Sequence, residues 1–188
     1  MVEIARYENF IDAQLLYAAM AKAGGDAANV YADRDAAQVN ALMRRTTQLL
    51  VPDEIVELVT ERLTAHAPIL QERFGTEPLI VEPPQFLKYV AGDYFVAHQD
   101  GNTPLIRDKA RFRRVSIVIY VNADYSGGAL TLHEPYPNSD VRTAIEPVPG
   151  TLIAFRSETT HEVTPVESGE RYTVVSWYAE PERRRPAG

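Results

Sequence analysis

Hydrophobic residues in the first 77 positions recur at intervals typical of helices. The stretch from Asn9 to Met20 predicts one helix, with Gly24-Gly25 as a stop signal after it. A second helix is expected from about Asp35 to Met43. A third should begin at Pro52, which two acidic residues follow, and Pro68 should kink it or end it early.

From about residue 78 the pattern changes to short runs rich in β-branched and aromatic residues. The expected strands are 86–90, 115–121, 129–133, 151–155 and 172–178. Glycine and proline turns separate them at regular intervals, and no helical pattern intervenes, which predicts an antiparallel sandwich or barrel. We therefore expect one α+β, mainly β domain over residues 1–188, with residues 1–77 as helical support for a β core over 78–180.

Composition narrows the chemistry that this domain can perform. The 188 residues include no cysteine and four histidines, so any metal must be held by nitrogen and oxygen ligands. No apolar run is long enough to cross a bilayer, and the N-terminus does not resemble a signal peptide. We therefore expect a cytoplasmic protein with no membrane partner. No heptad pattern or long apolar stripe predicts an oligomeric state.

The charge distribution argues against nucleic acid as a partner, because the net charge is −7 and a phosphate backbone would repel it. One segment departs from this average. Residues 107–114 hold five cations and one anion, a net +4. The segment is either a solvated loop or a cationic lip, formed by Arg107, Lys109 and Arg111, over a pocket for an anionic substrate.

A candidate metal site begins at His98-Gln99-Asp100. Residues two apart on an extended strand face the same side, so this imidazole and this carboxylate can share one ion. Alone, the triplet favours a surface turn that carries an exposed ion pair, so the metal site depends on a third ligand. The third ligand must be His66, His133 or His161. His66 lies in a helical stretch, and His133 either lines the pocket or is structural.

His161 is the preferred third ligand because it follows Asp100 by 61 residues, enough for several strands to travel out and return. Two imidazoles and one carboxylate leave three open positions on iron(II), which suit a bidentate 2-oxo acid and dioxygen. Arg171 follows at the start of another expected strand. Its planar guanidinium suits the distal carboxylate of 2-oxoglutarate.

From about Phe86 to Glu180 the sequence resembles the prolyl-hydroxylase-like branch of the 2-oxoglutarate and iron(II)-dependent dioxygenases. The resemblance rests on an ordered series: Tyr89 and Gly92-Asp93-Tyr94, His98-Gln99-Asp100, Arg114-Val115-Ser116, Ile119-Tyr120-Val121-Asn122, Gly127-Gly128-Ala129-Leu130, Pro149-Gly150-Thr151-Leu152 with Phe155, His161-Glu162-Val163, Pro165-Val166, and Arg171-Tyr172 before Trp177-Tyr178. The last segment is most similar to the hypoxia-sensing prolyl hydroxylases.

The resemblance implies a double-stranded β-helix, a jelly-roll or cupin-like barrel with iron at one open end. It implies iron ligation by His98, Asp100 and His161, a salt bridge from Arg171 to 2-oxoglutarate, and a hydrogen bond from Tyr89 to the same co-substrate. Leu130 and Trp177 should line the pocket. A second tyrosine of the hypoxia-sensing enzymes is matched here by Ile119, and Tyr120 is expected to face the opposite side of the sheet.

The implied reaction is hydroxylation of an unactivated C–H bond, with dioxygen consumed, succinate and carbon dioxide released, and ascorbate in support. A prolyl or peptide residue, a free amino acid and a small metabolite are all compatible substrates. Asp100 argues against a halogenase, whereas desaturation and ring closure use the same ligands. A nucleic-acid demethylase of the same superfamily would have a second arginine a few residues after the first, whereas this chain has Trp177 six residues after Arg171. The alternatives from other classes are a zinc hydrolase and a non-catalytic cupin-like binding module.

Overall fold

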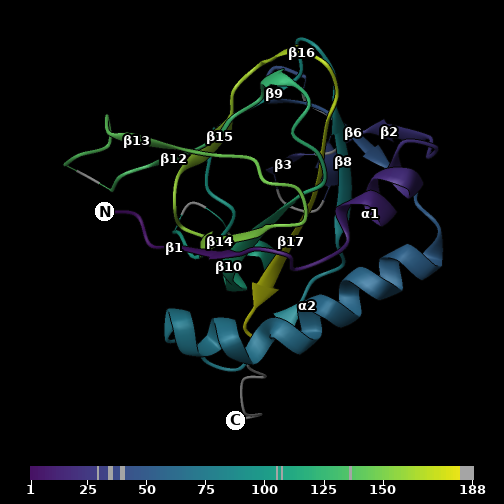
Figure 1. Ribbon diagram of the computed structural model, residues 1–188. Coiled ribbons are helices and arrows are strands. Elements are labelled where there is room, and N and C mark those ends of the chain that lie inside the picture. Colours follow the sequence, from purple (N-terminus) through teal and green to yellow (C-terminus); the bar gives the residue numbers. More distant parts are fainter. Residues whose placement is uncertain are drawn as a thin grey trace.

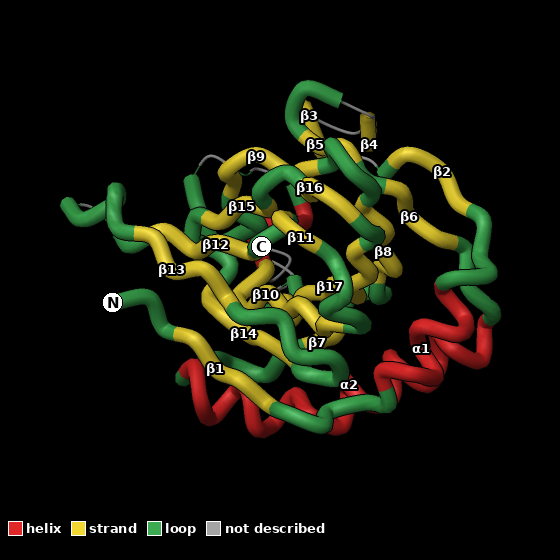
Figure 2. Tube along the Cα trace, turned by 45° about the horizontal axis from the view of Figure 1, so that its top comes forward, coloured by secondary structure: helices red, strands yellow, loops and turns green. Residues whose placement is uncertain are grey.

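Two antiparallel sheets face each other in the computed structural model, and two helices cover the larger sheet (Figures 1 and 2). The structure describes residues 1–28, 30–33, 36–38, 41–104, 106, 108–135 and 137–182, without the side chains of 30–33 and 36–38. The helices are α1 (Ala13–Met20) and α2 (Asp53–Phe74), with a 3₁₀ turn, η1, at Lys109–Phe112.

The larger sheet has the strand order β1-β14-β10-β17-β8-β6-β2, and β7 also pairs with β17. Its strands are β1 (Ile4–Tyr7), β14 (Leu152–Arg156), β10 (Arg113–Tyr120), β17 (Arg171–Ala179), β8 (Gln85–Tyr89), β6 (Thr47–Leu49), β2 (Gly25–Ala27) and β7 (Ile80–Val81). The central strands of the expected β core, β10 and β17, lie at the middle of this sheet.

The smaller sheet has the order β13-β12-β15-β9-β5. Its strands are β13 (Arg142–Ile145), β12 (Leu130–His133), β15 (His161–Val163), β9 (Tyr94–His98) and β5 (Arg44–Arg45). Two further pairs are β11 (Ser126–Gly127) with β16 (Val166–Ser168), and β3 (Val30–Asp33) with β4 (Ala36–Gln38). The facing antiparallel sheets confirm the expected barrel, a double-stranded β-helix.

The larger sheet separates two hydrophobic layers. On β10, Ile117 and Ile119 pack in the layer shared with α1 and α2, whereas Val118 and Tyr120 pack between the sheets. Strand β17 alternates in the same way, with Tyr172 and Val174 on the helix side. Because both faces are covered, most residues of the two central strands are buried, and their middle parts are rich in valine, isoleucine and aromatic residues.

Helix α1 begins later than its apolar pattern predicts. The Asp12 side chain caps it by accepting hydrogen bonds from the backbone N–H groups of Gln14 (2.9 Å) and Leu15 (3.2 Å). Residues before an N-cap lie outside the helix, so the expected start at Asn9 is wrong. The helix ends at Met20, as expected, and buries Leu16 and Met20.

Helix α2 continues through Pro68 to Phe74, so the expectation of an early end is wrong. Pro68 is exposed on the face turned away from the sheet. The Thr64 carbonyl that would have bonded to the residue at this position is on the same exposed face, where water can satisfy it. The helix ends instead at Gly75, whose φ of 60° is in the left-handed region that favours glycine.

The expectation of a purely helical first part is also wrong. Residues 1–77 contribute six strands besides the two helices, and the span predicted as a second helix, Asp35–Met43, contains β4 in its described part. Strand β1 pairs with β14 and β6 pairs with β8, so no boundary separates residues 1–77 from the β core. These strands have at most four residues each, too few for periodicity to reveal them.

His66 lies partly buried on α2, as expected, with its ring edge-on to Tyr7 (4.3 Å between centroids) and Phe10 (5.3 Å). Burial lowers the pKa of His66 below its ordinary 6.5. The unfolded chain therefore binds this proton more readily, so the stability that neutral His66 supports is complete above pH 6.5 and is lost as the pH falls.

We expect His66→Leu to lose less stability than the wild type between pH 7.5 and pH 5, because leucine has no proton to take up. Urea unfolding of both proteins at several pH values measures the difference. Parallel pH profiles for the two proteins would show that His66 does not contribute to the pH dependence.

No described helix is both long enough and apolar enough to cross a membrane.

Candidate active site

Three of the residues singled out in the sequence meet at one end of the barrel. His98 ends β9 and His161 begins β15, and the two are directly paired across these strands. Asp100 follows on the loop after β9, where its N–H donates to the Ser157 carbonyl at 2.9 Å. Among the described residues, these three offer ligand atoms that all lie within 4.8 Å of one another.

A β-bulge in β9 turns His98 into the barrel. The register shifts by one residue between the pairs His161↔His98 and Val163↔Phe95. Ordinary alternation would send Phe95 and His98, three residues apart, to opposite faces of the sheet. With the extra residue between them, their rings stack at 3.7 Å and 17° inside the barrel.

Backbone carbonyls fix which nitrogen of each imidazole faces the site. Nδ1–H of His98 donates to the Val96 carbonyl (2.8 Å), and Nδ1–H of His161 donates to the Thr159 carbonyl (2.9 Å). A carbonyl can only accept, so the neutral rings carry their proton on Nδ1 and leave the Nε2 lone pairs free. The Nε2 atoms lie 3.5 Å (His98) and 3.4 Å (His161) from the Asp100 carboxylate oxygens.

The electrostatics favour neutral imidazole beside ionised carboxylate. Burial, together with the nearby His98, lowers the pKa of His161 to about 4. Burial by itself would raise the pKa of Asp100, but His161, His98 and a hydrogen bond from the Trp177 indole hold it well below its usual range. At neutral pH His161 is therefore a neutral nitrogen donor and Asp100 an anionic oxygen donor, the protonation states in which these side chains bind a metal.

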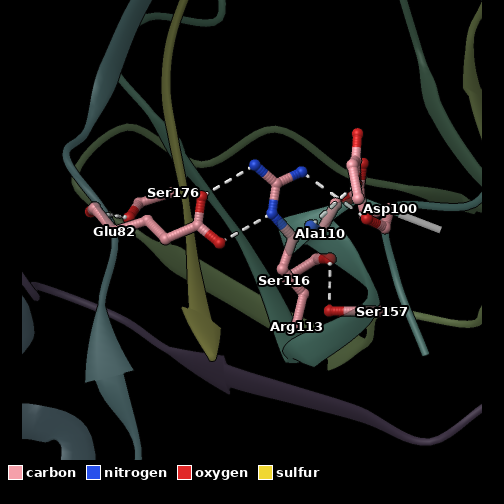
Figure 3. Close-up of polar contacts among 8 residues, drawn as sticks. Glu82, Asp100, Ala110, Arg113, Ser116, Ser157 and Ser176 are labelled. Atoms are coloured by element: carbon pink, nitrogen blue, oxygen red, sulfur yellow. Dashed lines mark hydrogen bonds and ion pairs between the residues drawn. The ribbon is translucent and has the colours of Figure 1, made fainter. Parts of the chain in front are cut away.

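Arg113 anchors the loop that carries Asp100 (Figure 3). Its guanidinium donates to both carboxylate oxygens of Glu82, at 2.8 and 2.7 Å, and to the Asp100 carbonyl at 3.5 Å. It also lies 3.7 Å from the centre of the Trp177 ring. A bidentate pair on a stacked arginine has little freedom, so the Asp100 loop is held rigidly next to the site.

Gly101 permits this close packing. A Cβ at this position would lie 2.4 Å from the Ala110 carbonyl oxygen and 2.6 Å from Cβ of Arg113. Both distances are shorter than van der Waals contact, so any larger residue would push the Asp100 loop away from Arg113.

The second feature is Arg171, which begins β17 as expected and points into the barrel. Its side chain is buried, with the residue 1% exposed, and it lies 5.0 Å from the Tyr89 ring centre and 5.7 Å from that of Tyr120. One Nη donates to the Thr173 hydroxyl at 3.2 Å. Within the described part of the chain, its buried Nε has no hydrogen-bond partner.

The structure corrects the assignment of Ile119 and Tyr120. Tyr120 faces the barrel interior beside Arg171, and Ile119 packs against the helix layer. The two residues do face opposite sides of the sheet, as expected, but each on the side opposite to the expected one. Every residue of β10 from Val115 onward is buried, so hydrophobicity did not distinguish its two faces.

One cavity connects the ligand group to Arg171. Its wall includes Tyr89 and the two residues expected there, Leu130 and Trp177. His133 is not in this wall; its Nε2 pairs with Glu162 at 3.1 Å, which fits a structural role. The wall also includes Arg44, a buried residue whose guanidinium lies 4.9 Å from the Phe95 ring centre. Arg44 was not predicted as a cavity residue because β5, only two residues long, gives no periodic signal.

Most of the described cations of the basic segment 107–114 are already paired with glutamates. Arg113 pairs with Glu82 (2.7 Å), Arg114 with Glu180 (2.8 Å) and Arg111 with Glu182 (3.6 Å). Lys109 is exposed, and Arg107 lies outside the described residues. The net +4 of the sequence is therefore largely neutralised. Of the two expected lip residues that the structure describes, Arg111 is paired and Lys109 shows no ion pair.

Comparison with known proteins agrees with this geometry. Residues 84–179 match the family model of the 2OG-Fe(II) oxygenase superfamily, where 2OG is 2-oxoglutarate. The chain belongs to this superfamily. A PKHD-type hydroxylase of Shewanella oneidensis is 30% identical over 153 residues, which are 76% of this chain and 65% of the relative. One of Sphingopyxis alaskensis is 34% identical over 102 residues, 53% of this chain and 45% of the relative. The chain thus spans less than two thirds of either relative.

Solved structures of the same fold include several prolyl hydroxylases. A Pseudomonas putida prolyl-4-hydroxylase superimposes with a TM-score of 0.63 at 23% identity, covering 98% of this chain and 95% of its own. A Trichoplax adhaerens prolyl hydroxylase, in complex with a peptide fragment of hypoxia inducible factor, superimposes with a TM-score of 0.69 at 21% identity. The match covers 94% of this chain and 83% of the hydroxylase. At these identities the likeness establishes the shared fold.

Proposed function

We propose that this superfamily member is an iron(II)- and 2-oxoglutarate-dependent hydroxylase, with His98, Asp100 and His161 as the iron ligands. The two Nε2 atoms and the carboxylate converge from one side, which fits a metal that keeps its other positions open. The Nδ1 hydrogen bonds to backbone carbonyls orient both rings, as outer-shell partners of ligating histidines do. Bound iron would supply the activation of dioxygen, while 2-oxoglutarate is converted to succinate and carbon dioxide.

Arg171 is the observation that carries the proposal. A buried guanidinium is costly unless an anion neutralises it, and no described carboxylate pairs with Arg171. It lies in the same cavity as the three ligand residues. A ligand with an anionic group at one end and a metal-binding group at the other would fit both ends of this cavity. We infer that 2-oxoglutarate binds here, with its distal carboxylate on Arg171.

Tyrosine hydroxyls complete the anion end. Tyr89 lines the cavity next to Arg171, and we assign it a hydrogen bond to 2-oxoglutarate. Tyr120, rather than Ile119, takes the place of the second co-substrate tyrosine, because its ring is the one beside the guanidinium. Burial raises the pKa of Tyr120 to about 12 against the opposing effect of Arg171. Its phenol is therefore neutral at pH 7, and its hydroxyl, which donates to the Ile145 carbonyl at 3.5 Å in the free protein, would donate to the carboxylate instead.

The wall between the two ends is largely apolar, with Leu87, Val163 and Val175 among its residues. Such a wall excludes water from the reacting groups and strengthens the electrostatic interactions inside. Arg44, Phe95 and Trp177 also line the cavity, and we infer that the substrate binds beside them. These residues would position the substrate C–H bond, and bound iron would supply the oxidising chemistry.

The substrate itself is proposed as a class. The PKHD-type name of the relatives and the prolyl hydroxylase neighbours favour a prolyl or other peptide residue, and a free amino acid or small metabolite fits the same chemistry. An anionic substrate is supported by Lys109 at the exposed start of η1 and by Arg44 in the cavity wall. The ion pairs of Arg111, Arg113 and Arg114 weaken the case for a broader cationic lip.

The test is succinate formation from 2-oxoglutarate with iron(II) and ascorbate, measured without a substrate and with each candidate class. We expect slow turnover by the protein alone and stimulation by the true substrate. Metal analysis of the purified protein addresses the zinc alternative, since zinc accepts the same ligands but a hydrolase does not need Arg171. Iron-loaded protein that neither turns over nor binds 2-oxoglutarate would contradict the proposal.

A further inference from the structure

A third phenol stands close to Arg171, on the turn between β10 and β11. Gly128 shows how close: a Cβ built there would lie 3.0 Å from Cδ of Arg171 and 3.5 Å from Cε2 of Tyr125. The Arg171 side chain and the Tyr125 ring therefore both pack against Gly128, where a side chain would collide with the arginine. The φ of Gly128, 59°, is also in the region that favours glycine.

Asn122 ties the Tyr125 turn to the start of β17. Its Oδ1 accepts from the Tyr172 N–H at 2.8 Å, and its Nδ2 donates to the Glu170 carbonyl at 2.7 Å. The same amide nitrogen donates to the Asp124 carboxylate at 2.6 Å. One side chain thus binds both residues flanking Arg171 and the residue before Tyr125, so the arginine and the tyrosine are held in fixed relation.

The turn at Gly169 closes on Tyr125 from the other side. A Cβ at Gly169 would lie 3.1 Å from both Cα and Cβ of Tyr125, and the φ of Gly169 is 79°. The turn that precedes Arg171 therefore packs directly on Tyr125. Both glycine turns, Gly127-Gly128 and Ser168-Gly169, are needed for this phenol to reach the guanidinium.

The charges agree with this placement. Burial raises the pKa of Tyr125, and the charge of Arg171 together with a hydrogen bond to it acts in the opposite direction. Arg171 affects Tyr120 in the same way, so both phenol oxygens lie near one guanidinium. A neutral phenol oxygen can accept a hydrogen bond from arginine without neutralising its charge.

We propose that Tyr125 is a positioning residue for the co-substrate, whose hydroxyl oxygen accepts a hydrogen bond from Arg171 and fixes the orientation of the guanidinium. This rests on the proposed function, in which Arg171 binds the distal carboxylate of 2-oxoglutarate. Arginine has five N–H donors on a planar group, and a phenol oxygen that accepts from one of them leaves others for the ligand. Without Tyr125 the guanidinium would have to be ordered by the ligand itself, at a cost in affinity.

The test compares Tyr125→Phe with the wild type as iron(II)-loaded protein under anaerobic conditions. Fluorescence of Trp177, the single tryptophan and a residue of the cavity wall, reports ligand binding. We expect the Kd for 2-oxoglutarate to rise about tenfold, the scale of one hydrogen bond to a charged group. The KM for 2-oxoglutarate should rise in parallel while kcat at saturation is unchanged. Binding of pyruvate, a 2-oxo acid without a distal carboxylate, should not change.

Tyr178→Phe is the matched control, because it also removes one buried hydroxyl, bonded at 2.7 Å to the Leu63 carbonyl on the helix side. Tyr178→Phe should lower Tm and leave 2-oxoglutarate binding intact. Tyr125→Phe should weaken 2-oxoglutarate binding and leave Tm nearly unchanged. Unchanged 2-oxoglutarate affinity in Tyr125→Phe overturns the inference. Equal losses for pyruvate and 2-oxoglutarate also overturn it, since they would indicate a general structural role. Wild-type protein that fails to bind 2-oxoglutarate overturns the proposed function and this inference with it.

Discussion

Replacing His161 by alanine should abolish iron binding and reduce 2-oxoglutarate turnover by more than about 100-fold, the upper range for loss of an outer-shell partner alone. His161 supplies one of the three converging ligand atoms, and burial keeps it neutral at pH 7, so it is ready to bind metal. Two ligands would remain, one of them the carboxylate of Asp100, and they are insufficient to hold iron(II) at micromolar concentrations. Iron content and succinate formation measure the effect.

His133→Ala is the matched control for this variant. His133 is on the neighbouring strand β12 and is also buried, but its Nε2 pairs with Glu162 rather than with the ligand group. The control should lose some stability and retain both iron and turnover. If His133→Ala lost iron as completely as His161→Ala, the ligand assignment would be wrong.

Replacing Arg171 by methionine should raise the Kd for 2-oxoglutarate at least about 100-fold while leaving the free protein equally or more stable. Loss of one partner of a buried ion pair costs about 3–5 kcal/mol, which corresponds to this factor or more. In the free protein, however, Arg171 is a buried charge with an unpaired Nε, so an apolar chain of similar length removes a cost. Ligand titration and thermal unfolding, with and without 2-oxoglutarate, measure both effects.

Arg156→Met supplies the contrast. Arg156 donates to Glu3 at 2.9 Å and to the Phe74 carbonyl at 2.9 Å, and so connects β14 to the N-terminal segment and the end of α2. Its replacement should lower Tm and leave 2-oxoglutarate affinity unchanged. A free Arg171→Met protein that unfolds as early as Arg156→Met would falsify the view that Arg171 is kept for an anionic ligand.

The sequence by itself determined the kind of site and the kind of barrel. The two-residue spacing of His98 and Asp100 predicted that both side chains face one point, although Asp100 lies on the loop after β9 and is held there by distant contacts. The absence of cysteine restricted any metal ligands to nitrogen and oxygen, and His161, with Arg171 ten residues later, completed the predicted set. Runs of β-branched and aromatic residues between glycine turns located the central strands of the β core to within two residues.

The sequence could not locate elements whose stability comes from distant partners. Strands β1, β5 and β6 have two to four residues each and form because β14, β9 and β8 offer free edges. The same limit hid Arg44, which β5 places in the cavity wall. Pro68 is tolerated because its position on α2 is exposed, a property of how the helix packs on the sheet rather than of the residue.

Only the tertiary structure decided which side of each buried strand faces the co-substrate. Alternation separates Ile119 from Tyr120, but both faces of β10 are buried, one by the helices and one by the opposite sheet, so polarity does not mark the inner one. The bulge in β9 likewise reverses the alternation between Phe95 and His98. Local sequence sets the alternation of side chains along a strand. Which of the two faces points into the cavity depends on the layers that cover the strand.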